Sequence, residues 1–288
     1  MLFSKEYKGI KIVINSKGAE QESLIINGID YMRERDEYWN RKAPVLFPIV
    51  GKLRDLRTSI DGKEYKMNQH GFARDKEFSL FKEDENSLEF LLTYSKDSLE
   101  IYPYKFNLYI KYLIDELGVS VSYKVVNVDD KDIYFNIGGH PGLKLPFNKD
   151  GEMFENYSVI FEKVESFDAP TVEDNGTLNF DITNPFYDIK KIDLDYKYFE
   201  IDAIVAPHLK SRSVNLVNKD GKGIKFDFFG FNSFALWTRP NAPFLCLEPW
   251  LGYADKYNSD YQFIHKDDIQ RLEPGNEKVV GYSIHILN

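Results

Sequence analysis

Three side chains that can carry a proton stand beside Gly or Pro at the ends of apolar runs. His70 precedes a Gly, His140 lies between two Gly and a Pro, and Glu248 ends an apolar run before a Pro. Gly permits unusual backbone angles and the close approach of a ligand, whereas Pro ends a strand. We therefore predict that these side chains lie at strand ends along a concave face.

Glu248 and His140 have the types needed for general acid and base chemistry. A carboxylate that ends an apolar run is predicted to be half buried, which raises its pKa by desolvation and suits a base working near neutral pH. Two structural alternatives stay open at this point. Glu248 could pair with an Arg at a strand end, and His140 could be a core histidine bonded to a backbone carbonyl.

Metal and disulfide chemistry have little support in the sequence. A His₂Glu site from His70, His140 and Glu248 is geometrically possible, but no His-x-x-x-His pair is present, and we predict no metal. The single Cys246 excludes a disulfide scaffold and a Cys-based zinc site, and it reads as a small buried hydrophobe. The remaining histidines are predicted to be structural or at the surface: His208, His265 and His285.

The elements that must position these residues are strands. Residues 106–112 and 119–125 alternate apolar and polar side chains around a turn, which predicts a long antiparallel hairpin. A third strand is expected over residues 132–138. Further strands are predicted over 10–15, 23–26, 87–94, 157–162, 213–217, 222–228, 233–238, 243–247 and 278–286. Only short helical turns are expected, at 34–42 and 257–260.

This pattern predicts an all-β chain forming one antiparallel sandwich over residues 1–288, since no repeat, linker or shift of composition marks a boundary. The net charge of −9 argues against nucleic acid as a partner. No signal peptide and no apolar run of membrane-spanning length is visible. We expect a soluble, cytoplasmic protein without membrane contact.

Six stretches in order resemble the aldose 1-epimerase family, and within it the LacX-like and YeaD-like branch. The resemblance covers nearly the whole chain, and the ordered set is specific where no single motif would be. The matching stretches are Pro-Val-Leu-Phe-Pro-x-x-Gly at 44–51, Gln-His-Gly-Phe-Ala-Arg at 69–74, Ile-Tyr-Pro-Tyr-Lys-Phe at 101–106, Gly-Gly-His-Pro at 138–141, Ile-Asp-Ala at 201–203 and Leu-Glu-Pro-Trp at 247–250.

The resemblance implies a galactose mutarotase-like supersandwich with a sugar site on its concave face. By the family pattern Glu248 matches the general base, His140 the general acid, His70 the second histidine and Asp202 the substrate-binding aspartate. Lys52 falls where the family usually has Arg, and a Lys cannot make the bidentate fork of a guanidinium. Arg54, two residues on, is expected to share the strand face of Lys52 and to be able to substitute for it.

The implied reaction is exchange of the α and β anomers of a free hexose, without a cofactor. Glu248 takes the proton of the C1 hydroxyl and His140, expected to be protonated near pH 7, donates to the ring oxygen. Arg74 is a further polar anchor for the sugar, and Trp250, Trp39 and Phe72 are candidates for stacking on it. Trp237 is assigned to the core because its strand is mostly apolar.

Two other functions remain open. A hexose-6-phosphate epimerase is the nearer one, because Arg74 with Lys52 or Arg54 could hold a phosphate. The other is a non-catalytic carbohydrate-binding or sensing protein on the same fold. A glycoside hydrolase normally needs two carboxylates, and this pattern offers one Glu and two His. The oligomeric state is left as a monomer or a homodimer.

Overall fold

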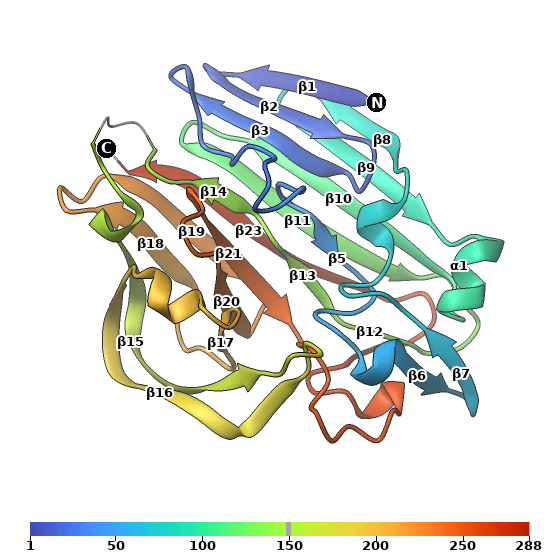
Figure 1. Ribbon diagram of the computed structural model, residues 1–288. Helices are drawn as coiled ribbons and strands as arrows, with labels where there is room; N and C mark the ends of the chain where they lie inside the picture. The colour runs from blue at the N-terminus through green and yellow to red at the C-terminus, as the bar shows by residue number, and fades with distance from the viewer. Residues whose placement is uncertain (148–150, 288) are drawn as a thin grey trace.

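The structure, a computed structural model, describes residues 1–147 and 151–287 and is built almost entirely from antiparallel strands (Figure 1). Its largest sheet has nine strands. In spatial order they are β16 (Leu178–Asp193), β15 (Tyr157–Val172), β18 (Ser213–Asn218), β19 (Gly223–Phe229), β23 (Glu277–Leu287), β11 (Gly118–Asn127), β10 (Phe106–Ile114), β9 (Ser87–Thr93) and β8 (Ser79–Asp84).

A six-stranded sheet packs on the nine-stranded one and carries the site. It contains β17 (Ile204–Ala206), β20 (Ser233–Trp237), β21 (Phe244–Leu251), β13 (Ile137–Gly139) and β5 (Val45–Leu46), with β14 (Gly142–Lys144) also paired to β21. The two sheets approach closely at Gly139, where a Cβ would lie 2.8 Å from the ring of Tyr282 on β23. Phe234 on β20 likewise stacks on Phe228 of β19.

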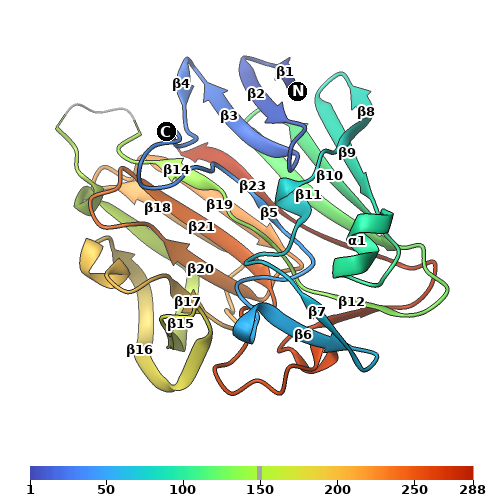
Figure 2. The ribbon, with the colours of Figure 1, turned by 45° about the vertical axis from the view of Figure 1, so that its right-hand side comes forward.

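A four-stranded sheet lies across the β8–β11 end of the large sheet, at the opposite end of the molecule from β15 and β16 (Figures 1 and 2). Tyr112 on β10 donates a hydrogen bond to the carbonyl of Ala19, and Phe3 packs edge-on against Phe90. The strands of this four-stranded sheet are β1 (Leu2–Tyr7), β2 (Ile10–Asn15), β3 (Glu20–Ile26) and β4 (Ile29–Asp30). Two two-stranded sheets complete the fold. One pairs β6 (Arg57–Ile60) with β7 (Lys63–Lys66), and the other pairs β12 (Ile133–Phe135) with β22 (Gln270–Leu272).

Alternating burial explains why the predicted hairpin forms. The side chains of β10 and β11 alternate between buried and partly exposed along most of both strands, and the strands pair from Phe106↔Asn127 to Ile114↔Val119. One face of each strand therefore enters the apolar layer between the sheets, as a period of two requires. The prediction of an all-β sandwich of antiparallel sheets is confirmed.

Three details differ from the sequence prediction. The expected strand at 132–138 is two strands in two sheets, because Asn136 between them donates its backbone N–H to the carbonyl of Pro48. The prediction of helical turns at 34–42 and 257–260 is wrong, because neither segment forms a helix. In the first segment, Arg33 donates hydrogen bonds to the carbonyls of Trp39 and Arg41 and so holds the backbone in an irregular path. The helices in the described residues are α1 (Lys96–Ile101) and the 3₁₀ turns Arg54–Leu56, Ala73–Asp75, Phe154–Asn156, Tyr196–Phe199 and Phe263–His265.

No helix in the part of the chain that the structure describes is both long enough and apolar enough to cross a membrane.

Candidate active site

Strand β21 carries the central carboxylate. All eight of its residues are buried, and successive side chains point to opposite faces of the sheet. Leu245 and Leu247 enter the main apolar cluster between the two sheets, whereas Glu248 and Trp250 line a cavity of about 520 Å³ on the other side. Of the apolar run that precedes Glu248, Leu245 and Leu247 thus face the core, whereas Phe244 and Cys246 share the face of Glu248.

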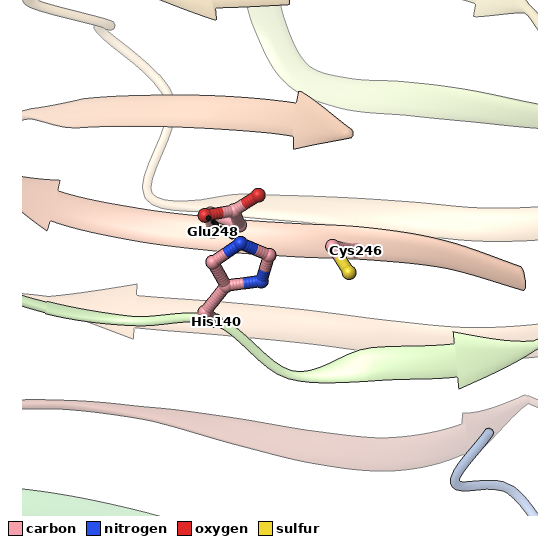
Figure 3. Close-up of side chains that lie close together, drawn as sticks. All are labelled: His140, Cys246 and Glu248. Atoms are coloured by element: carbon pink, nitrogen blue, oxygen red, sulfur yellow. Dashed lines mark ion pairs between the residues drawn. The ribbon is translucent and has the colours of Figure 1, made fainter. Parts of the chain in front are cut away.

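Glu248 and His140 both line this cavity, and their side chains point toward each other (Figure 3). His140 Nε2 lies 3.1 Å from Glu248 Oε2, and the two side chains are 8% and 1% exposed. The contact is close but is not aligned as a hydrogen bond, and Glu248 Oε2 and His140 Nδ1 both lack a hydrogen-bond partner. Buried polar atoms without partners are rare in folded proteins, so these atoms mark a place for a polar ligand.

Burial disfavours the charged form of both members of this pair. Burial raises the pKa of Glu248 well above its usual range, and the charge of Asp202 raises it further. Burial together with the charge of Arg74 lowers the pKa of His140 to about 3. These surroundings favour a neutral His140 and a protonated Glu248 in the protein without sugar, which opposes the prediction that His140 is protonated near pH 7.

His70 is fixed as a neutral hydrogen-bond donor. The backbone N–H of Gly51 donates to His70 Nδ1 at 3.0 Å, which leaves Nε2 as the nitrogen that carries the proton. Burial lowers the pKa of His70 well below its usual value. The residue has φ +64°, an uncommon conformation outside glycine, and a Cβ at Gly71 would lie 2.2 Å from the Phe47 carbonyl oxygen. This strained turn aims the ring at the cavity, where it meets His140 edge-on at 5.6 Å.

Asp202, Arg74, Lys52 and Trp250 also line the cavity, as predicted. Asp202 accepts the Ala203 backbone N–H at 2.8 Å, and burial raises its pKa. Arg74 donates to the Gln69 carbonyl, its Nε has no partner, and burial lowers its pKa to about 10. The indole N–H of Trp250 is directed at the Glu248 carboxyl, whose pKa it lowers, although the contact does not have the geometry of a full hydrogen bond. Polar atoms from several elements thus converge on one space.

Arg54 and Phe72 do not line this cavity. The 3₁₀ turn Arg54–Leu56 breaks the strand that was expected to place Arg54 beside Lys52. Arg54 instead bonds the Ser259 carbonyl at 2.7 Å and lies over the ring of Tyr261. Phe72 is 8% exposed and packs on Phe47, Tyr102 and Phe106 in the core. Neither side chain is placed to contact a sugar there.

Trp39 and Trp237 take places that differ from the prediction. Trp39 lines the cavity but stacks on the ring of His140, with centroids 4.6 Å apart and planes 30° apart. Trp237 was assigned to the core, yet it lines the cavity and meets His140 at 81°. It pairs with Cys246 across the sheet, so the alternation from Glu248 could have placed it on this face.

Several lining residues carried no signal in the sequence analysis. They come from the turn between β15 and β16 and from the segments around Asp202 and after Trp237: Glu173, Asp174, Glu200 and Arg239. The predicted surface positions of His208 and His265 are confirmed.

Among the described residues, His140, Cys246 and Glu248 form a group whose donor atoms lie within 4.8 Å of one another (Figure 3). An imidazole, a thiolate and a carboxylate are ligands that Zn²⁺ accepts. The Cys246 thiol, however, does not line the cavity, and burial with the nearby charge of Glu248 raises its pKa well above its usual range. The thiol proton therefore opposes metal binding, and His70 is not in this group.

Comparison with known proteins agrees with the fold and the motifs. The profile of the aldose 1-epimerase family matches residues 2–285. This chain belongs to the aldose 1-epimerase family. It is 35% identical to Protein LacX (plasmid) of Lactococcus lactis subsp. lactis over 273 residues, which cover 91% of each chain. The chromosomal LacX protein of the same organism matches equally.

Solved structures of this family share the fold. The galactose mutarotase related enzyme from Lactobacillus acidophilus superposes with a TM-score of 0.93 at 29% identity, covering 100% of this chain and 98% of that one. A galactose mutarotase-like protein from Lactobacillus casei gives a TM-score of 0.89 at 24% identity, with both chains covered in full. The second likeness concerns the fold alone.

Proposed function

We propose that this family member is a metal-independent aldose 1-epimerase that interconverts the α and β anomers of a free hexose. The observation that carries the proposal is the buried Glu248–His140 pair at 3.1 Å, set in a cavity with unpartnered polar atoms. Anomer exchange needs one group that accepts a proton and one that donates a proton, and this pair supplies both.

The reaction uses the single proton of the pair. Transfer from Glu248 to His140 across 3.1 Å gives a carboxylate and an imidazolium with no net gain or loss of protons. Glu248 then takes the proton of the C1 hydroxyl while the bond between C1 and the ring oxygen breaks. The electron pair of that bond goes to the ring oxygen, which takes the proton from His140, and C1 becomes an aldehyde.

Ring closure reverses these transfers after rotation about the C1–C2 bond. In the open-chain state Glu248 again carries the proton and His140 is neutral, which is the arrangement that burial favours in the protein alone. Two positioned groups of this kind each contribute typically ~10²–10⁴-fold to the rate. His70, as a fixed neutral donor, holds a sugar oxygen near the reacting centre, and Asp202 and Lys52 hold further hydroxyls.

Replacing Glu248 tests the proposal directly. Glu248→Gln keeps the size of the side chain but cannot accept the C1 proton, so we expect kcat to fall by at least about 10³-fold while sugar binding stays measurable. The measurement is NMR exchange spectroscopy or polarimetry of anomer exchange, with calorimetry for binding.

A matched control is Cys246→Ala, which changes the same face of the same strand at a residue that does not line the cavity. It should keep its activity, and so should the wild-type protein treated with a chelator. Full activity of the Glu248→Gln variant would remove Glu248 as the base. Sugar binding by the wild-type protein without any exchange would favour a non-catalytic binding protein.

A phosphorylated hexose is a second candidate, favoured by a neighbouring cavity. This cavity, of about 420 Å³, shares Trp39 and Arg74 with the first and is lined by four cationic side chains and two carboxylates: Lys17, Arg35, Arg41 and Arg74 against Glu20 and Asp75. A phosphate there would offset the charge of Arg74 that lowers the pKa of His140. The same assay with glucose and glucose 6-phosphate separates the two: a higher kcat/KM for the phosphate would select this candidate.

A further inference from the structure

The ring of Trp39 is held against the face of His140. The two rings are stacked with centroids 4.6 Å apart, which places the aromatic surface of the indole over the imidazole. Trp39 belongs to the irregular segment between β4 and β5 and is partly exposed, because it also borders both cavities. Its packing on His140 leaves it poorly placed to stack on a sugar, which was its expected role.

A buried arginine fixes the backbone that carries Trp39. Arg33 is 1% exposed and donates to the carbonyls of Trp39 and Arg41, the second at 2.7 Å, while it pairs with Asp36. Its guanidinium carbon lies 4.1 Å from the centre of the Phe244 ring and 5.3 Å from that of Trp39. This arrangement holds the indole in one place without a helix or strand.

The other surroundings of His140 mostly oppose a positive charge on its ring. Burial disfavours the imidazolium, and three arginines act in the same direction: Arg74, Arg41 and Arg33. Its neighbours His70 and Cys246 supply no compensating charge, because the pKa of His70 is lowered and that of Cys246 is raised. Glu248 favours the imidazolium only after it has given up its own proton. The proposed reaction nevertheless needs His140 to be charged when the ring opens.

We propose that Trp39 is a positioning residue whose π-face stabilises the His140 imidazolium by a cation–π interaction. An aromatic face carries partial negative charge, and a cation above it is attracted most strongly where water is excluded. The indole thereby raises the share of the carboxylate–imidazolium form of the pair. This inference rests on the proposed function, because it concerns the acid of that reaction.

Fluorination of the indole tests this role without changing the shape of the site. Each fluorine withdraws electron density from the ring face while the indole keeps nearly the same size, so a purely structural role is unaffected. Site-specific incorporation of mono-, di- and trifluorotryptophan at position 39 should lower kcat stepwise, to a total loss of about tenfold, with KM within twofold. The assay is anomer exchange followed by NMR.

Substitutions at position 39 give a second readout, with denaturant melts to compare the stability of each variant. Trp39→Phe should retain most of the activity and Trp39→Leu should lose as much as the trifluoro form.

Two outcomes separate the inference from the proposed function. A wild-type protein that exchanges anomers, with a kcat independent of fluorination at position 39, would overturn the role of Trp39 alone. A wild-type protein that exchanges no anomers would overturn the proposed function, and this inference with it.

Discussion

The cationic side chains of Lys52 and Arg54 are close in the sequence but have different surroundings. Lys52 lines the cavity, and its aliphatic stem passes so close to Gly176 that a Cβ there would lie 2.6 Å from Lys52 Cδ. The turn between β15 and β16 therefore holds the ammonium group in place. Arg54 faces the opposite way, toward Ser259 and Tyr261. Of these two side chains, that of Lys52 lines the cavity and can contact a ligand there, whereas that of Arg54 cannot.

We therefore expect opposite effects from the two matched substitutions. Lys52→Met removes a charged hydrogen-bond donor and should raise KM for the sugar about tenfold or more. Arg54→Met should leave KM unchanged and lower the free energy of unfolding by about 1 kcal/mol, through loss of its surface contacts. Steady-state anomer exchange and urea denaturation provide the two measurements. An increase in KM for Arg54→Met equal to that for Lys52→Met would contradict this assignment.

At the residue scale, motif spacing predicted the central ionisable residues of the cavity, and the errors came from local geometry. Glu248, His140 and His70 lie together as expected because each stands where an apolar run meets Gly or Pro. Arg54 was misplaced because a 3₁₀ turn replaces the strand on which its direction depended. Trp237 was misplaced because both faces of β20 are largely buried, which hides the face that lines the cavity.

At the element scale, strand alternation predicted many of the central strands, but it missed β1, β6, β7 and β8 and the curved hairpin at the edge of the site. β15 and β16 have 16 residues each, and their pairing has three register shifts. Of this hairpin, the sequence analysis predicted only residues 157–162 as a strand. β16 was missed because it is mostly exposed and lacks an apolar face. The turn of this hairpin nevertheless supplies Glu173 and Asp174 to the cavity.

A buried ion pair ties the elements around Lys52 together. Lys266 Nζ lies 2.6 Å from Asp255 Oδ1, and both side chains are 3% exposed. Asp255 also accepts the backbone N–H of Arg54, and its own backbone bonds Lys52 and Leu178. One aspartate thus joins the segment after β5, the start of β16 and the 3₁₀ turn Phe263–His265.

Removing one partner of this pair should lower the free energy of unfolding. Lys266→Met leaves the Asp255 carboxylate buried without its cation, and we expect a loss of about 3–5 kcal/mol in the free energy of unfolding, together with a raised KM. The matched control is Lys191→Met, which breaks the exposed pair with Asp193 and should cost less than about 1 kcal/mol. Denaturant melts compare the two. Equal losses would show that the buried pair has no special role.

At the scale of the whole molecule, charge is distributed unevenly between the two cavities. The cavity around Glu248 holds more carboxylates than basic side chains, in keeping with a protein of net charge −9. The neighbouring cavity has the reverse balance, and Arg74 lies between them. Composition alone could not predict this division, because the residues concerned are distant in sequence and meet only through the fold. If the substrate is a sugar, as proposed, we expect an anionic substituent to be accepted best at the Arg74 end.

The buried site should also make stability depend on pH. An unfolded chain protonates His140 below about 6.5, whereas the folded protein resists this down to about 3. Between these values the unfolded state binds more protons, so the free energy of unfolding falls as pH falls, by about 1.4 kcal/mol per pH unit for this residue. The raised pKa of Glu248 acts in the opposite sense: above its usual 4.5 the folded state keeps a proton that the unfolded state has lost, so stability falls as pH rises toward the folded pKa.

Single substitutions should separate these two contributions. In His140→Asn the contribution of His140 is removed, so the slope of the profile below pH 6.5 changes by about 1.4 kcal/mol per pH unit. Between pH 4.5 and 6.5, where the two contributions oppose each other in the wild type, the variant keeps only that of Glu248. Glu248→Gln should abolish the fall in the free energy of unfolding that Glu248 causes as pH rises above 4.5, because the amide does not titrate. Denaturant melts at half-unit pH steps from 4 to 9 provide the profiles. Parallel curves for the wild type and His140→Asn would mean that His140 titrates normally in the folded protein, and the neutral imidazole that the one-proton pair requires would be lost.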